Sequence, residues 1–298
     1  MRCKSKQCFK FMLPVVFVYC LVCFQNRCAG SGPATAWYTT MNEAVDLQFF
    51  GQKEQELALY EEALSLAPSD EYRADTLLYM AQAYEGLRLR SKAIEVYKRI
   101  VADYPSGQHI PRVYFRLGEV HTSITLLPEK TDPEQERQII ESQMLPSISI
   151  PYFEQSVASG GPFDLWGLAS RIYLAGLYRN TGFETEGWDI VHELANLNVY
   201  DVTSPKYVGP YVEMNAGETT LCEWLDDART IAARVRNSAR KKLVSWSLSG
   251  GPVQSIINLH ALIRRYPGTE IEARAQEKVE ELAEEILAAT IGEIELNQ

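Results

Sequence analysis

Residues 74–107 read ADTLLYMAQAYEGLRLRSKAIEVYKRIVADYPSG, and this stretch decides the fold. Apolar or small residues recur three or four positions apart on both sides of Gly86, which predicts two amphipathic helices joined by a turn. They are Leu77, Met80, Ala81 and Tyr84, then Ala93, Ile94, Tyr97, Ile100 and Val101. Tyr104 should end the second helix, because Pro105 disfavours helical geometry in the residue before it. One hairpin cannot bury both apolar faces, so we expect further copies at a period of about 34 residues.

Residues 37–198 hold about four such copies. The first is marked by Tyr60, Ala63, Leu64 and Pro68, and the fourth by Leu174, Ala175, Tyr178 and Gly182. In the third copy, Pro111 suits the first turn of a helix. Its second helix comes late in the sequence, after an insertion at 126–146. Insertions of this kind project from one face of a helical solenoid, and that face is often used for binding.

The pattern lapses at residues 199–217, which we interpret as an ordered, irregular loop. Its tyrosines, Tyr200, Tyr207 and Tyr211, should pack back on the body. Helical periodicity returns in residues 218–298 with a capping box that starts at Thr220, one more hairpin, and an acidic helix at about 270–289 that would cap the array. The sequence therefore predicts an all-α solenoid of about five helical hairpins with a C-terminal capping helix.

Composition and charge narrow the classes of function. The 298 residues are 46% apolar and 23% charged, as in an ordinary folded protein. The net charge is −10, and residues 37–298 carry 24 basic against 39 acidic side chains, which argues against a nucleic-acid partner. Five of the six cysteines lie before residue 29, so Cys222 has no partner in the body for an internal disulfide.

Residues 1–36 predict an export signal that is cleaved after Ala36. A basic start precedes an apolar run of 14 residues, from Phe11 to Phe24, and a small-residue stretch follows it. The run is shorter than the ~20 residues that a permanent membrane helix needs. Three alternatives stay open: an uncleaved anchor, a lipid anchor on one of the N-terminal cysteines, and a start at Met41 that would leave the protein in the cytoplasm.

No pattern of catalysis or cofactor binding is visible. The phosphate-loop, dinucleotide, nucleophile-elbow and H-E-x-x-H motifs are missing; His192-Glu193 comes nearest the last, but residue 196 is Asn. The four histidines lie far apart in sequence, and His121 and His260 fall on helix faces that should pack. We therefore expect no enzyme activity, no cofactor and no metal site.

One basic cluster stands out in the acidic body, on the helix that follows residue 218. We interpret it as a solvated helix face or as a docking patch for an acidic partner or anionic head groups at a membrane surface. Its candidate docking residues are Arg229, Arg236 and Arg240.

The pattern Ala81, Tyr84, Ala93, Tyr97 and Pro105 resembles the tetratricopeptide repeat (TPR). The endings VADYPSG and IRRYPGT are similar to those of exported TPR proteins of the bacterial cell envelope, of the outer-membrane assembly lipoprotein or periplasmic cell-division coordinator type. The resemblance implies a right-handed superhelix in which the first helix of each hairpin lines a groove for a partner's peptide or helix. Family members that clamp a C-terminal carboxylate use Lys and Asn where this chain has Leu78 and Gln82, so we do not expect that use.

Carried over position by position, the resemblance implies nine groove residues. They are Leu78, Gln82, Glu85, Phe115, Glu119, Thr122, Ile172, Gly176 and Arg179. We therefore expect a non-catalytic scaffold that binds a partner protein in the periplasm or cell envelope. The alternative is a binding protein for a glycan or small molecule, in which the tyrosines of 199–217 would line a pocket.

Overall fold

The computed structural model describes residues 33–122, 146–161, 164–200 and 218–296, and all of its regular structure in these ranges is α-helical. The all-α prediction is confirmed. The chain divides into two compact units, residues 1–68 and 69–298, which are described separately. None of the helices in the described ranges combines the length and apolar character that a membrane crossing requires. The apolar run of the predicted export signal and the insertion at 126–146, apart from Pro146, lie outside the described residues.

The first unit is one helical hairpin, α2 (Pro33–Phe49) packed on α3 (Lys53–Leu66). Gly51 supplies the turn between them with φ +71°, a conformation that costs glycine little. Trp37 and Tyr60 are fully buried, which matches the expectation of a hairpin here. The predicted cleavage point after Ala36 falls within the first turn of α2.

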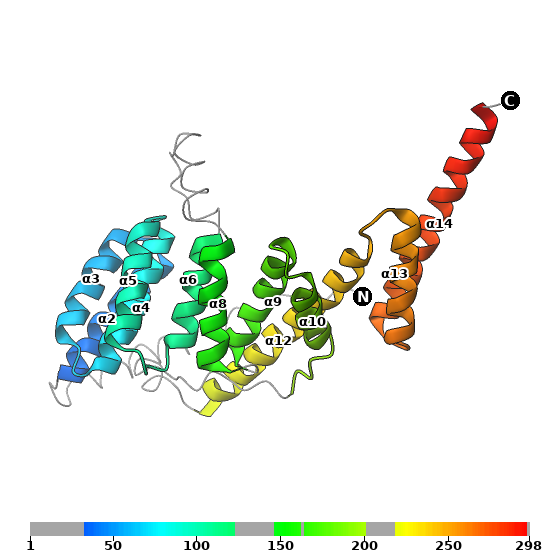
Figure 1. Cartoon of the computed structure of the whole chain (residues 1–298). Helices are drawn as coiled ribbons and strands as arrows, with labels where there is room; N and C mark the ends of the chain where they lie inside the picture. The colour runs from blue at the N-terminus through cyan, green and yellow to red at the C-terminus, as the bar shows by residue number, and fades with distance from the viewer. Residues whose placement is uncertain (1–32, 123–145, 162–163, 201–217, 297–298) are drawn as a thin grey trace, which may run out of the picture. The chain divides into compact units, whose positions relative to one another are not determined.

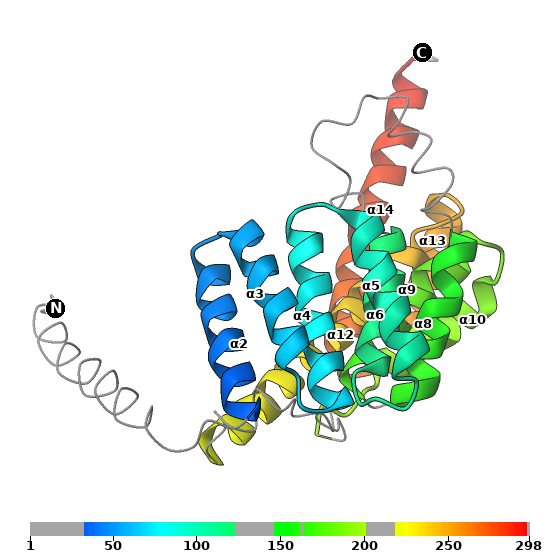
Figure 2. The same cartoon turned by 90° about the vertical axis from the view of Figure 1, so that its left-hand side faces the viewer.

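The second unit continues as four more hairpins and a last helix, in the order that Figure 1 shows. The hairpins are α4 (Asp70–Gly86) with α5 (Arg90–Asp103), α6 (Ile110–Thr122) with α8 (Pro146–Gly160), α9 (Leu165–Asn180) with α10 (Glu184–Ala195), and α12 (Glu218–Ser247) with α13 (Pro252–Arg265). The last helix, α14 (Glu270–Leu296), packs on α13, and its C-terminal part extends past the other helices (Figures 1 and 2). It runs longer than the capping helix we expected at 270–289.

Local sequence signals account for several helix ends. Tyr104 and Tyr266 leave helical geometry in nearly the same way, with φ −132° and −127°, and each is followed by proline. Asp164 caps α9 by accepting hydrogen bonds from the backbone N–H groups of Trp166 and Gly167. The turn expected around Gly86 lies between α4 and α5, and Arg88 takes the left-handed conformation in it, with φ 58°.

Two apolar clusters hold the second unit together. The smaller one centres on Phe115, Phe153 and Leu174, where α6, α8 and α9 meet. The larger one joins α9, α10, α12, α13 and the start of α14, and Leu168, Leu243 and Leu259 lie fully buried in it. In these clusters the hairpins from α6 to α13 bury apolar faces against one another, as a stacked repeat requires.

Candidate functional site

Four helices that each begin a hairpin in the second unit, α4, α6, α9 and α12, form the surface on which the predicted groove residues lie. We call it the first-helix face; its side chains include Glu85, Glu119, Tyr173, Arg179 and Lys242. α6 packs on α9 and α9 packs on α12, and the ion pair between Arg116 and Glu85 joins α6 to α4. The face therefore brings together residues that lie far apart in the sequence.

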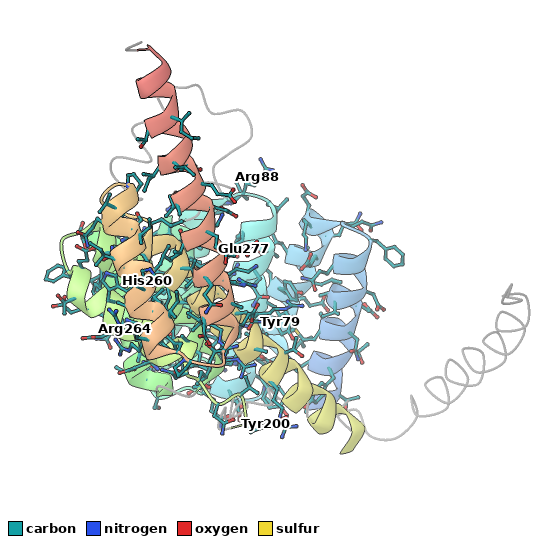
Figure 3. The ribbon with its side chains drawn as sticks, turned by 90° about the vertical axis from the view of Figure 1, so that its right-hand side faces the viewer. Tyr79, Arg88, Tyr200, His260, Arg264 and Glu277 are labelled. Atoms are coloured by element: carbon teal, nitrogen blue, oxygen red, sulfur yellow. The ribbon has the colours of Figure 1, made fainter. Side chains whose placement is uncertain are left out.

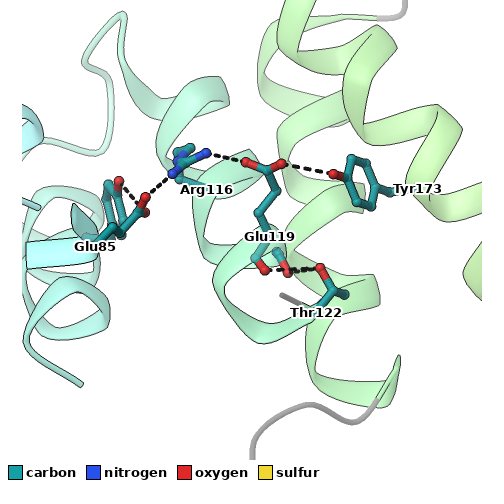
Figure 4. Close-up of polar contacts among 7 residues, drawn as sticks. Glu85, Arg116, Glu119, Thr122 and Tyr173 are labelled. Carbon is teal, nitrogen blue, oxygen red and sulfur yellow. Dashed lines mark hydrogen bonds and ion pairs between the residues drawn. The ribbon is translucent and has the colours of Figure 1, made fainter. Parts of the chain in front are cut away.

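A polar network runs across three of these helices (Figure 4). Arg116 on α6 forms ion pairs with Glu85 on α4 and with Glu119 on its own helix. The Glu119 carboxylate also accepts a hydrogen bond of 2.9 Å from the Tyr173 hydroxyl on α9. Burial raises the pKa of Tyr173 to about 12, and the Glu119 charge adds to the rise, so this hydroxyl stays a donor.

Glu85 is nearly buried and makes a second contact inside its own hairpin. The Tyr97 hydroxyl on α5 donates a hydrogen bond of 2.8 Å to it, and burial raises the pKa of Tyr97. Because a carboxylate in such a site needs partners for both oxygens, Tyr97 and Arg116 together hold Glu85 in place. Glu85 fixes the joint between α4 and α6.

Aromatic side chains pack behind the network. The Phe115 ring lies 5.9 Å from Phe153, 5.3 Å from Trp166 and 5.8 Å from Tyr173, measured between centroids. The Phe153 and Tyr173 rings stack at 5.0 Å. This cluster fixes the position of the Tyr173 hydroxyl at the surface.

The end of α9 meets α12 at a second joint of different charge. The Arg179 guanidinium lies 4.6 Å and the Lys242 ammonium 5.6 Å from the centroid of the Trp246 ring. Burial, and next the charge of Arg179, lower the pKa of Lys242. Gly176 leaves room for the lysine, since a Cβ at this glycine would stand 3.8 Å from the Lys242 Nζ. We call Arg179 and Lys242 the cationic pair.

The predicted groove residues are not equally available to a partner. Leu78 is fully buried and Phe115 is 7% exposed, so their side chains lie in the interior. Thr122 bonds to the backbone of its own helix, and Ile172 packs against the larger apolar cluster. Other predicted positions, Gln82, Glu119, Gly176 and Arg179, are half-buried on the first-helix face.

The predicted basic docking residues have separate environments. The Arg229 guanidinium lies 5.6 Å from the centroid of the Tyr200 ring. Arg240 donates a hydrogen bond to the Ala195 carbonyl and lies 3.9 Å from a carboxylate oxygen of Glu270. Arg236 is half-buried. Lys242 belongs to the basic run on this helix. Sequence reasoning did not foresee its approach to Arg179, because α10 and residues 196–217 lie between the two helices in the sequence.

Two expectations need correction. Tyr200 does not pack into the core. It is 75% exposed, and its ring lies beside the guanidinium of Arg229, which is also exposed. Tyr207 and Tyr211 lie outside the described residues. His260 does not face a packed surface either, because it is exposed on α13 (Figure 3).

The other histidines occupy separate places. His121 is buried as expected and stacks on Tyr152. The His192 Nδ1 lies 2.5 Å from the Tyr266 hydroxyl, and burial lowers the pKa of this histidine. In the part of the chain that the structure describes, no three His, Cys, Asp or Glu side chains gather as a metal site would need. The side chain of Cys222 lies outside that part.

Comparison with known proteins supports the helical-repeat interpretation at one hairpin. Residues 75–107 match the family model of the tetratricopeptide repeat, which confirms the resemblance over the stretch that covers most of α4 and all of α5. A crystal structure of a thermophilic TPR protein from Thermus thermophilus is similar to this chain, with 15% identity and a TM-score of 0.37, over 82% of this chain and 98% of that one. No curated protein matches the sequence.

Proposed function

We propose that this chain, a helical protein with a tetratricopeptide repeat at residues 75–107, is a non-catalytic scaffold that binds a segment of a partner protein on its first-helix face. Tetratricopeptide repeats generally mediate contacts between proteins. The observation that carries the proposal is the polar network. It places part-exposed charged and hydroxyl groups from α6 and α9 on one surface, and the nearly buried Glu85 on α4 holds Arg116 in position.

A preformed surface suits this task physically. Arg116 and Glu119 hold one another in place, and the aromatic neighbours of Tyr173 hold its ring. These side chains are therefore already ordered, and binding a partner costs little further conformational entropy. The arrangement offers donors and acceptors along three helices, which fits an extended or helical segment better than a small ligand.

Photocross-linking tests the choice of surface. A photoreactive amino acid would replace Gln82 or Arg179, which are half-buried on the first-helix face, in the full chain expressed in its own cells. Matched controls would carry it at Lys98 on α5 or Gln155 on α8, which are exposed on second helices. We expect the same protein adduct from both first-helix positions and none from the controls.

The captured protein must then bind the purified full chain in solution. Adducts that form equally from Lys98 and Gln155, or a captured protein that shows no binding once purified, would contradict the proposal.

We further propose that the scaffold is exported and works in the periplasm or cell envelope, on the strength of the tripartite pattern in residues 1–36. Cell fractionation and mass spectrometry of the mature protein test this. A mature N-terminus at Trp37 in the envelope fraction is the expected result, whereas an intact Met1 or a start at Met41 in the cytoplasm would refute export.

Binding at a membrane surface through Arg229 and its neighbours belongs to the same proposal, and flotation with anionic vesicles would reveal it.

A further inference from the structure

Two of the three joints of the first-helix face, α4 with α6 and α9 with α12, differ in charge. Between α4 and α6, an arginine from one helix meets a carboxylate from the other, since Arg116 pairs with Glu85. Between α9 and α12, both helices supply a cation, Arg179 and Lys242. When the repeats are aligned, Arg179 of the α9 hairpin corresponds to Glu85 of the α4 hairpin. The second joint therefore lacks the carboxylate that completes the first.

Nothing in the described structure neutralises the cationic pair. Among the described residues, no carboxylate forms an ion pair with Arg179 or Lys242, although the whole chain carries a net charge of −10. Both side chains are half-buried and held over Trp246, which is 7% exposed. Two like charges in a partly desolvated site repel one another, and an anion placed between them would lower that cost.

We propose that the cationic pair binds the carboxylate of an aspartate or glutamate side chain in the partner segment. The inference rests on the proposed function and names the chemistry of its ligand at one place. The partner segment is therefore acidic where it crosses the end of α9.

A side-chain carboxylate fits better than the more highly charged anions. Arg116 is already satisfied by two carboxylates on the same face, so this surface pairs guanidinium with carboxylate. A phosphate dianion or an anionic membrane would bring more negative charge toward a body that is itself strongly acidic.

The test uses the full chain and a short peptide with acetylated and amidated ends that carries one glutamate among glutamines, followed by NMR at low ionic strength. The indole N–H resonance of Trp246, assigned with the Trp246→Phe variant, reports on the site. We expect the peptide to shift this resonance and blocked polyglutamine to leave it unchanged. Arg179→Gln and Lys242→Gln should each weaken binding about tenfold, the loss typical of removing one charged partner.

Lys241→Gln is the matched control, because Lys241 is exposed and neighbours Lys242 on α12. It removes the same charge from outside the site, and we expect less than about a twofold effect. Lys242→Arg keeps the charge and should keep binding. If Lys242→Gln fails to fold, as circular dichroism would show, Lys242→Arg and Arg179→Gln still decide the question.

Several results would overturn the proposal. An equal loss in the Lys241 and Lys242 variants would mean unspecific attraction. If binding required a free C-terminus on the peptide, the cationic pair would recognise a C-terminal carboxylate and not a side chain. Stronger binding of inorganic phosphate or of phosphatidylglycerol vesicles than of the peptide would assign it to those anions. Cross-linking at Gln82 can succeed while the peptide fails, so failure of this inference is distinguishable from failure of the scaffold proposal.

Discussion

Replacing Gly118 by alanine should destabilise the protein, although alanine favours helices more than glycine does. Gly118 lies within α6, and a Cβ there would stand 2.6, 2.7 and 2.8 Å from three carbons of the Phe153 ring. Ordinary contact begins at 3.4 Å, so the ring would have to retreat by about 0.8 Å. Phe153 is fully buried and its ring stacks on Tyr173, so it has little room to move.

The expected loss follows from two opposing effects. Overpacking a core costs about 1–3 kcal/mol, and a shift this large against a ring without free space belongs at the upper end. The gain in helix propensity from glycine to alanine returns about 1 kcal/mol. We therefore expect a net loss of about 2 kcal/mol in the free energy of unfolding, measured by urea titration with circular dichroism and an unchanged slope.

Gly176 provides the matched control, because it also lies inside a helix of the first-helix face. An alanine there would meet only the Lys242 Nζ, at 3.8 Å, so it should stabilise the protein by up to about 1 kcal/mol. In the Gly118→Ala protein, Phe153→Leu should cost less than it does alone, since leucine frees the space that the methyl group needs. If Gly118→Ala stabilised the protein as Gly176→Ala does, the close packing of α6 on α8 would be refuted.

Three further outcomes can be measured. Glu85→Gln should cost about 2 kcal/mol of stability in a urea titration, because it removes the nearly buried carboxylate that joins α4 to α6; a loss no greater than that of an exposed glutamate would contradict this. Burial lowers the pKa of His109 to about 3, so the unfolded chain takes up this proton first as pH falls. The contribution of His109 to stability should therefore begin to be lost as pH falls toward 6.5 and approach a loss of about 1.4 kcal/mol per pH unit below about pH 5.5, and His109→Asn should remove that part of the slope. Arg179→Met should raise the pKa of Lys242 toward its ordinary value in an NMR titration, and an unchanged pKa would place the two cations farther apart than the structure does.

Local sequence signals were enough for the helices and their ends. The three-and-four spacing around Leu77 and Tyr97 predicts α4 and α5, because each helix buries one face and apolar residues at that spacing mark the buried face. The Tyr-Pro pairs at 104–105 and 266–267 mark helix ends because proline acts on its immediate neighbour. Glu119 and Arg179 were chosen as groove residues from the family resemblance and not from this spacing; both are half-buried in the structure.

Contacts between hairpins could not be read from the sequence. Periodicity gives the buried face of a helix, but it does not give the angle and register at which one helix packs on the next. Leu78, a groove residue by the family resemblance, is buried, and Tyr200, which we expected to pack back on the body, is 75% exposed.

The sequence by itself determined that the chain is a stack of helical hairpins, because hydrophobic spacing and proline act locally. Only the tertiary structure decided that Arg116 pairs with two carboxylates while Arg179 and Lys242 both lie near the Trp246 ring, without a carboxylate partner among the described residues. The physical reason is that charge pairing depends on a few ångströms between side chains from different hairpins, and the packing of the whole stack sets those distances.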